Sequence, residues 1–191
     1  MDIVSFLLGI VTSFIAWLLV FHFFVPKVNF SEKISKQVDS NSNFKYRIKI
    51  ENAGARSIYE LNIYVKISIR GLNIERKRNL EVTFLPVSFE GVIPIIEPVK
   101  KTRRRNLIKI DPNKTEEFER DIYPSEVRNK VKNKQLLLED LLSLGSEAWL
   151  ELYIIGNDQF SGSRKVITSK KYYKQDIVDK PFDKNSLEIK T

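Results

Sequence analysis

The segment FKYRIKI, residues 44–50, alternates apolar and basic side chains without a break. This period of two is typical of a β-strand with one buried and one solvent-facing side. The segment IYELNIYVKISI, residues 58–69, alternates again from Leu61 onward, and residues 51–55 between the two segments are typical of a turn. Two amphipathic strands in succession predict a domain built from antiparallel sheets.

Further short runs predict strands at 80–85, 87–96, 107–110 and 117–123, and a hairpin formed by 148–155 and 163–173. Residues 125–144 predict one helical insertion, broken near Asn133, with the leucine-rich half as the firmer part. Residues 26–43 are polar and predict a linker with a weak helix over 32–38, and residues 183–191 predict a flexible tail. The domain over residues 44–182 is therefore expected to be mainly β, an antiparallel sandwich.

Residues 152–182 resemble the end of the cytoplasmic immunoglobulin-like domain of inward-rectifier potassium channels. The resemblance rests on a loop, a returning strand, a short acidic segment and a closing aromatic residue, in the order Ser161-Gly162, Tyr172-Tyr173, Asp176-Ile177 and Phe182. It implies an immunoglobulin-like sandwich on the cytoplasmic side, although Lys180 stands where that family usually has glycine. Channel activity is not implied, because that family needs two spanning helices and a T-x-G-[YF]-G filter, and this sequence has one apolar span and no such motif.

The N-terminal residues 3–25, IVSFLLGIVTSFIAWLLVFHFFV, contain no Asp, Glu, Lys or Arg. As a helix these 23 residues measure roughly 34 Å, enough to cross a hydrocarbon core of about 30 Å. A cleaved signal peptide would need a basic start, a shorter apolar run and a small-residue cleavage site, and a core helix would need a larger domain to cover it. We therefore expect a single transmembrane helix within residues 1–25.

Basic residues follow this apolar span closely, at Lys27, Lys33 and Lys36, and none precedes it. Because flanking positive charge stays on the cytoplasmic side, the β domain is expected to be cytoplasmic and the protein a single-pass protein of the cell membrane. Residues 26–191 contain 32 basic and 23 acidic residues, a balance that suits an anionic inner leaflet.

The densest charge in the chain is the run KKTRRR, residues 100–105. It is interpreted as a solvated loop, as a site for anionic lipid headgroups, or as a nucleic-acid site. Nucleic acid is the less favoured ligand, because no aromatic side chain interrupts the run to stack on bases. The residues assigned to lipid or polyanion binding are Lys100, Lys101, Arg103, Arg104, Arg105 and Lys109.

Small residues recur at every fourth position of the apolar span, at Ser5, Gly9 and Ser13. This spacing lets two helices approach closely and predicts helix association, although small residues are also common in spanning helices by chance.

The composition excludes several kinds of chemistry. The chain has no cysteine and one histidine, so disulfides, thiol nucleophiles, zinc ribbons, iron–sulfur clusters and multi-histidine metal centres are ruled out. It also lacks the glycine-rich phosphate loops and the G-x-S-x-G elbow. The acidic groups at 116–121 and 139–140 are interpreted as solvated faces, and neither catalysis, a metal nor a cofactor is expected.

The function predicted from the sequence is that of a membrane-anchored binding, sensor or regulatory module without catalysis. Its expected partners are membrane lipids and a protein, which can be a second copy of the chain; the sequence does not indicate a small-molecule ligand. The alternative is an oligomerising, membrane-disrupting effector of the toxin or anti-phage type, whose sandwich senses a trigger.

Overall fold

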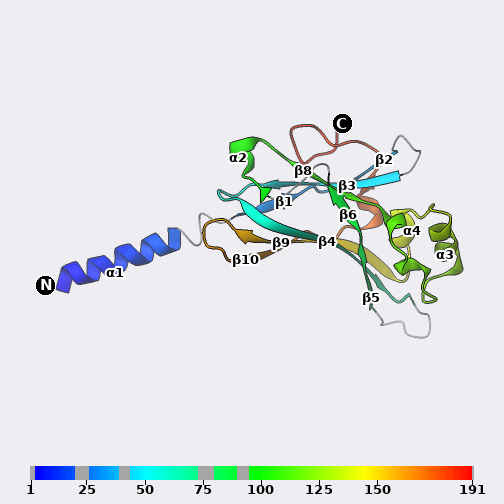
Figure 1. Ribbon diagram of the computed structural model, residues 1–191, viewed down its shortest axis with the longest axis horizontal. Helices are drawn as coiled ribbons and strands as arrows, with labels where there is room; N and C mark the ends of the chain where they lie inside the picture. The colour runs from blue at the N-terminus through cyan, green and yellow to red at the C-terminus, as the bar shows by residue number, and fades with distance from the viewer. Residues whose placement is uncertain (1–2, 20–25, 39–43, 73–79, 90–94, 191) are drawn as a thin grey trace.

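The computed structural model describes residues 3–19, 26–38, 44–72, 80–89 and 95–190. Beyond the N-terminal helix, the described residues from 26 onward form a β domain in which two sheets face each other (Figure 1). The first sheet has the order β11-β2-β3-β8-β6 with β1 also paired to β3, and the second has the order β10-β9-β4-β5 with β7 also paired to β4. The strands of the first sheet are β1 (Val28–Phe30), β2 (Ile34–Val38), β3 (Phe44–Asn52), β6 (Val87–Phe89), β8 (Asn106–Ile110) and β11 (Ile177–Val178). Those of the second are β4 (Ile58–Arg70), β5 (Leu80–Leu85), β7 (Ile95–Ile96), β9 (Glu147–Asp158) and β10 (Arg164–Thr168).

The alternation of β3 and β4 places one side of each strand in the core. Ile48 and Ile50 of β3 are fully buried, as are Val65 and Ile67 of β4. Since β3 lies in the first sheet and β4 in the second, these two strands require the sheets to pack against each other. The prediction of a mainly β fold is confirmed.

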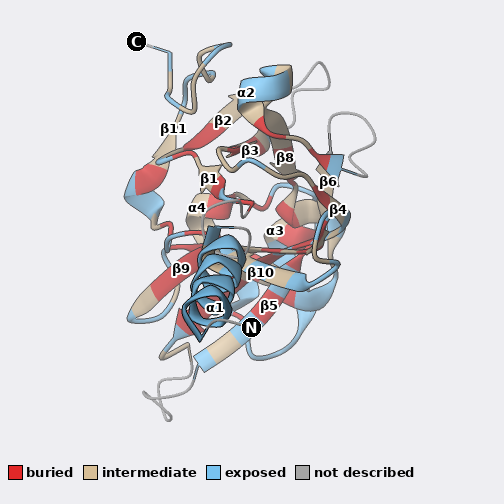
Figure 2. Ribbon diagram, turned by 90° about the vertical axis from the view of Figure 1, so that its left-hand side faces the viewer, coloured by how far each residue is buried: buried red, intermediate tan, exposed pale blue. Residues whose placement is uncertain are grey.

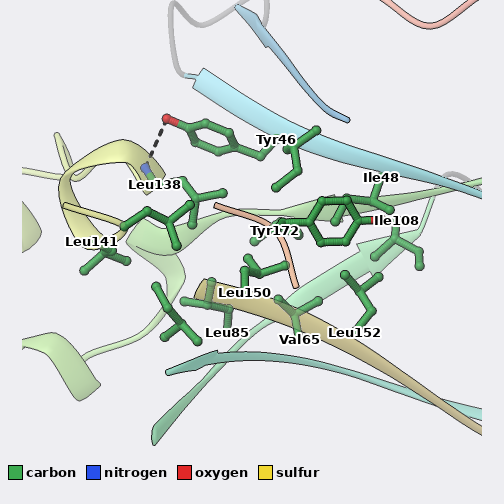
Figure 3. Packing of buried hydrophobic residues seen from close by; sticks show 14 of the residues in the cluster. Tyr46, Ile48, Val65, Leu85, Ile108, Leu138, Leu141, Leu150, Leu152 and Tyr172 are labelled. Carbon is green, nitrogen blue, oxygen red and sulfur yellow. Dashed lines mark hydrogen bonds between the residues drawn. The ribbon is translucent and has the colours of Figure 1, made fainter. Parts of the chain in front are cut away.

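The core between the sheets combines side chains from distant parts of the sequence (Figure 3). Tyr172, which follows β10, is completely buried, and its hydroxyl donates to the carbonyl oxygen of Ser31 at 2.6 Å. Its backbone also exchanges two hydrogen bonds with Leu150 of β9. The residue therefore joins the start of the first sheet to the middle of the second.

Residues 26–43, predicted as a linker, instead contribute strands β1 and β2. Strand β2 pairs antiparallel with β3 and parallel with β11, so the fold is not purely antiparallel. Ile34 is fully buried, and the Ser35 hydroxyl donates to the carbonyl oxygen of Lys180 at 2.7 Å. The weak helix predicted over 32–38 is wrong, because residues 34–38 form a strand that pairs with β3 and β11.

Most of the other strand predictions are confirmed. Strands β5, β8 and the antiparallel β9–β10 hairpin lie where the alternation places them. The run 87–96 divides between β6 and β7, which belong to different sheets, and residues 90–94 lie outside the described residues. The strand predicted at 117–123 is wrong: Phe118 lies in a 3-10 turn, η4 (Glu117–Glu119), and its ring packs edge-on against Tyr123 with centroids 5.2 Å apart.

The helical insertion divides into α3 (Ser125–Lys132) and α4 (Leu138–Leu141), with α3 ending at the predicted break, Asn133. The leucine-rich half is not the firmer part, since α4 is a single turn of four residues and α3 has eight. A further short helix, α2 (Val99–Thr102), lies within the basic run and was not predicted. Two more 3-10 turns are η3 (Pro112–Lys114) and η5 (Lys174–Asp176).

The N-terminal helix, α1 (Ile3–Leu18), has 16 residues, none of them buried, as Figure 2 shows. It is shorter than the 23-residue span that the sequence predicts, and residues 20–25 of that span lie outside the described residues. Among the helices in the described part of the chain, none combines the length and apolar character needed to cross a membrane.

Lys49 departs from the alternation of β3, because its side chain lies on the outer face and is nevertheless buried. Its ammonium group donates to the carbonyl oxygens of Asp183, Lys184 and Ser186 at 2.6, 3.2 and 2.7 Å. Burial lowers the pKa of Lys49 and the nearby Arg105 lowers it further, whereas the carboxylates of Asp183 and Glu51 partly offset this by favouring the charged form. Residues 183–190, predicted as a flexible tail, are therefore bound to the outer face of the first sheet.

Replacing Lys49 by methionine should detach this C-terminal segment. Methionine keeps most of the side-chain volume but leaves the three carbonyl oxygens without their donor, so we expect amide exchange in residues 183–190 to accelerate at least about tenfold. Hydrogen–deuterium exchange measures this, with Lys114→Met at an exposed position as the control. Unchanged exchange in Lys49→Met would show that the lysine does not hold the segment.

Candidate binding surface

The buried side chain of Asn52, at the end of β3, joins three connections of the chain. Its Oδ1 accepts the backbone N–H groups of Lys27 (3.3 Å) and Gly54 (2.9 Å). Its Nδ2 donates to the carbonyl oxygens of Arg56 (2.6 Å) and Ile96 (3.1 Å). The chain from α1 enters the β domain at Lys27. The side chain of Asn52 therefore holds three segments together at one end of the domain: this entrance, the β3–β4 turn and the segment leading to α2.

The turn between β9 and β10 joins the same end. The N–H of Gln159 donates to the carbonyl oxygen of Ser57 at 3.2 Å. The carboxylate of Asp158, 1% exposed, accepts bonds from the Ser161 hydroxyl (2.8 Å), the Phe160 N–H (3.2 Å) and the guanidinium of Arg56 (3.2 Å). Burial alone would raise the pKa of Asp158, but these donors outweigh it and lower the pKa. We call residues 53–57, 97–105 and 159–163 together the entrance end.

Four cationic side chains project from the entrance end. Lys100, Lys101, Arg103 and Arg104 are exposed, and among the described residues no carboxylate lies within ion-pair distance of them. They lie on and just after α2, a single turn without buried residues that is followed by Arg103 in the left-handed conformation, with φ 55°. The entrance end contains six basic residues and one acidic residue, so its potential is positive.

The structure divides the set of basic residues that the sequence predicts as one site. Arg105 is engaged, since its Nε donates to Glu51 at 2.8 Å and its side chain is only 19% exposed. Lys109 lies on β8 opposite Arg47 of β3, within the first sheet and not in the loop. The four residues of α2 and the loop after it therefore form the exposed part of the site.

A hollow of about 370 Å³ lies between the β3–β4 turn, the segment around α2 and the β9–β10 turn, with Ser57, Pro98, Lys101 and Phe160 among its lining residues. The guanidinium of Arg56 lies over the ring of Phe160, 4.3 Å from its centroid, and the phenylalanine is 65% exposed. Sequence reasoning missed both residues as part of this site. The available signal was Ser161-Gly162, which marks a tight turn and hence the exposure of the preceding phenylalanine.

The small residues of α1 lie together, as the sequence predicts. Ser5, Gly9 and Ser13 line one side of the helix, where they form a hollow with Phe6 and Ile10. A Cβ atom added at Gly9 would meet nothing within 4 Å. This side of α1 is therefore a shallow groove that a second helix could fill.

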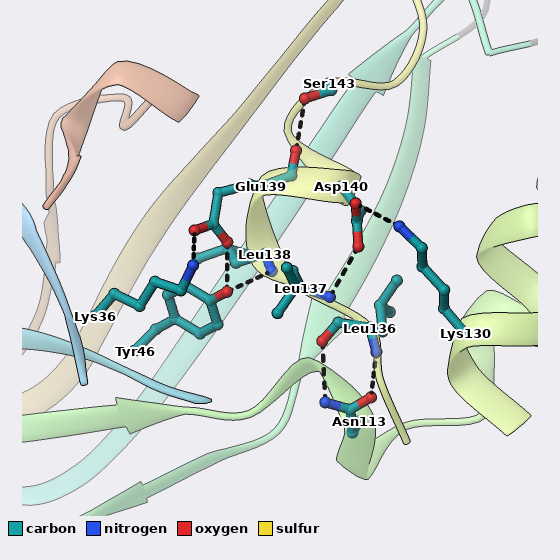
Figure 4. A network of polar contacts seen from close by, with 10 residues as sticks. All are labelled: Lys36, Tyr46, Asn113, Lys130, Leu136, Leu137, Leu138, Glu139, Asp140 and Ser143. Atoms are coloured by element: carbon teal, nitrogen blue, oxygen red, sulfur yellow. Dashed lines mark hydrogen bonds and ion pairs between the residues drawn. The ribbon is translucent and has the colours of Figure 1, made fainter. Parts of the chain in front are cut away.

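The acidic pair Glu139–Asp140 has a structural role (Figure 4). Glu139 accepts bonds from the buried Tyr46 hydroxyl and from Lys36, and that hydroxyl accepts the Leu138 N–H at 3.1 Å. Burial raises the pKa of Tyr46 far above its usual range, and the Glu139 carboxylate raises it further. The interpretation of this pair as a solvated face is corrected: Glu139 fastens α4 to β3.

Asp140 fastens the other side of α4. Its carboxylate accepts the Leu137 N–H at 3.1 Å and pairs with Lys130 of α3 at 2.8 Å (Figure 4). Both carboxylates lie at the end of the domain that carries α3 and α4, opposite the end that carries α2 (Figure 1).

The chain matches neither a protein-family model nor a curated protein sequence.

Replacing Asn52 by alanine should loosen the entrance end as a unit. The change removes four hydrogen bonds and leaves buried backbone groups unpaired, which is expected to cost about 2–3 kcal/mol in the free energy of unfolding. Urea denaturation measures the cost, and amide exchange should accelerate most in residues 97–105. Asn62→Ala at an exposed position of β4 is the matched control, expected within about 0.5 kcal/mol of the native chain. Equal stability of the two variants would contradict the assigned role of Asn52.

Proposed function

We propose that the protein is a single-pass, membrane-anchored β-sandwich of immunoglobulin-like type that acts as a binding, sensor or regulatory module without catalysis. The observation that supports it is the environment of α1, whose apolar side chains are exposed and which contributes no residue to the core. Phe6 is 64% exposed and Ile3 77%. A charge-free apolar segment left outside the core needs another apolar environment, and a bilayer supplies one for residues 3–25.

The β domain is proposed to lie on the cytoplasmic side. Lys27, Lys33 and Lys36 follow the apolar segment, and positive flanks favour the cytoplasm. The immunoglobulin-like type rests on the resemblance of residues 152–182 to inward-rectifier cytoplasmic domains and is supported by the β9–β10 hairpin. Absence of catalysis is proposed because the carboxylates at 139–140 serve structure and Ser161 bonds to Asp158 within a turn.

A second candidate function is favoured by the groove on α1 lined by Ser5, Gly9 and Ser13. If helices of several copies pack through this groove, the segment itself would perturb the membrane, and the sandwich would control it in response to a trigger. The protein would then be an oligomerising effector of the toxin or anti-phage type.

Deleting residues 1–25 should release the protein from membranes. The full chain is expected in the membrane fraction after cell disruption and alkaline washing, soluble only with detergent, and the shortened chain in the supernatant. In intact cells, external protease should leave the β domain uncut. A full chain that is soluble without detergent would contradict the anchor, and external cleavage of the β domain would contradict the sidedness.

Replacing Gly9 by isoleucine should block helix association if the groove is an interface. The added side chain fills the groove, so we expect cross-linked oligomers in membranes to fall by at least about tenfold. Val11→Ile in the same helix is the control and should leave cross-linking unchanged. Unchanged oligomers and unchanged host toxicity in Gly9→Ile would remove the support for the effector function.

A further inference from the structure

Phe160 is the exposed tip of a rigid turn at the entrance end. The turn is closed by bonds between Asp158 and Ser163 and between Gly162 and Asp158, at 3.0 and 2.9 Å. Gly162 has φ 64°, a conformation that favours glycine. The Asp158 carboxylate accepts the Phe160 N–H, and the guanidinium of Arg56 contacts both that carboxylate and the ring of Phe160. The aromatic ring is therefore held in an exposed position by a preorganised scaffold.

One of the four exposed cations, Lys101, lies beside this ring, and the other three are its neighbours along the chain. Lys101 and Phe160 line the same hollow, and Lys100 and Arg103 belong to the same turn of chain as Lys101. The one acidic residue of the entrance end, Glu97, is half-buried. The end thus combines an exposed aromatic side chain with an uncompensated positive charge.

The entrance end also lies next to the proposed anchor. This follows from the contacts of Lys27 and does not depend on the orientation of α1. Lys27 bonds to Asn52, Ala53 and Gly54 at the entrance end, and it follows the apolar segment by two residues. Two residues of extended chain reach at most about 7 Å. An anchor formed by residues 3–25 therefore keeps the entrance end at the membrane surface.

We propose that the entrance end docks on an anionic lipid bilayer, with Phe160 inserted at the interface and the cations of α2 and its following loop on the headgroups. This inference rests on the proposed membrane anchor and adds the orientation of the β domain. An exposed apolar side chain such as phenylalanine is stabilised at the boundary between headgroups and acyl chains, and basic side chains near an anionic leaflet strengthen binding about fivefold each. A single-stranded nucleic acid would also contact the cations and stack a base on Phe160. The bilayer is favoured because the chain from the proposed anchor enters the domain at this end.

The docking can be tested on residues 26–191 alone, because the core begins at Val28 and α1 supplies none of it. Co-sedimentation with phosphatidylcholine vesicles, with and without phosphatidylserine, measures the affinity. We expect binding to the phosphatidylserine vesicles, weakened by salt.

Neutralising three of the cations should weaken this binding about tenfold to a hundredfold. The variant is Lys100→Gln, Lys101→Gln and Arg104→Gln; Arg103 is kept because of its left-handed backbone. A matched control removes three exposed basic side chains near the opposite end, through Lys114→Gln, Arg120→Gln and Lys132→Gln. The control should lose little affinity, because it has the same net charge but an intact entrance end.

The insertion of the ring is tested with a fluorescent label, for which the absence of cysteine in the chain is convenient. A single Phe160→Cys variant carrying an environment-sensitive dye should shift to shorter wavelength on vesicles and be quenched by brominated lipid. The matched control is Phe84→Cys, since Phe84 is 55% exposed on the outer face of β5. Its dye should remain in water.

Four outcomes would overturn the docking. They are no preference for phosphatidylserine, equal losses in the two triple variants, lipid quenching at position 84 in place of 160, or binding to single-stranded RNA but not to vesicles. The proposed anchor is tested separately, by whether the full chain needs detergent to leave the membrane. Failure of the docking and failure of the proposed function are therefore distinguishable.

Discussion

The entrance end depends on the side-chain amide of Asn52, which is completely buried and bonded on both sides. A buried amide without partners is costly, so the connections that pair with it must stay where they are. One of them brings in the chain from α1, another turns from β3 to β4, and the third leads into α2. The segment that carries the exposed cations is therefore held next to the point where the chain from α1 joins the domain, although about seventy residues separate the two in the sequence.

The fold was predictable where strands alternate strongly. Strands β3 and β4 bury one face each, and the period of their side chains reports this directly. Strands β1 and β2 were missed because they are short and lack a sustained alternation, and their burial depends on distant partners, such as Ile177 of β11 for Ile34. The strand predicted at 117–123 failed for the opposite reason, since Phe118 and Tyr123 are apolar but meet across a helical turn.

The candidate site was predictable only in part, because charge density is visible in the sequence and contacts between loops are not. The run 100–105 was identified by its charge, but the ion pair of Arg105 with Glu51 and the place of Lys109 within a sheet follow from strand pairing. Phe160 and Arg56 meet because Gln159 bonds to Ser57, and Asp158 to Arg56, across two turns. A long-range contact of this kind leaves no periodic pattern from which it could be inferred.

The central claim is that the end of the domain where the chain enters is the end that faces lipid. The most direct measurement is the paramagnetic broadening of backbone amides in the full chain, held in anionic nanodiscs with gadolinium-chelating lipids. The account predicts the strongest broadening in residues 53–57, 97–105 and 159–163 and the weakest in α3 and α4. Strongest broadening in α3 and α4, or uniform broadening over the β domain, would contradict it.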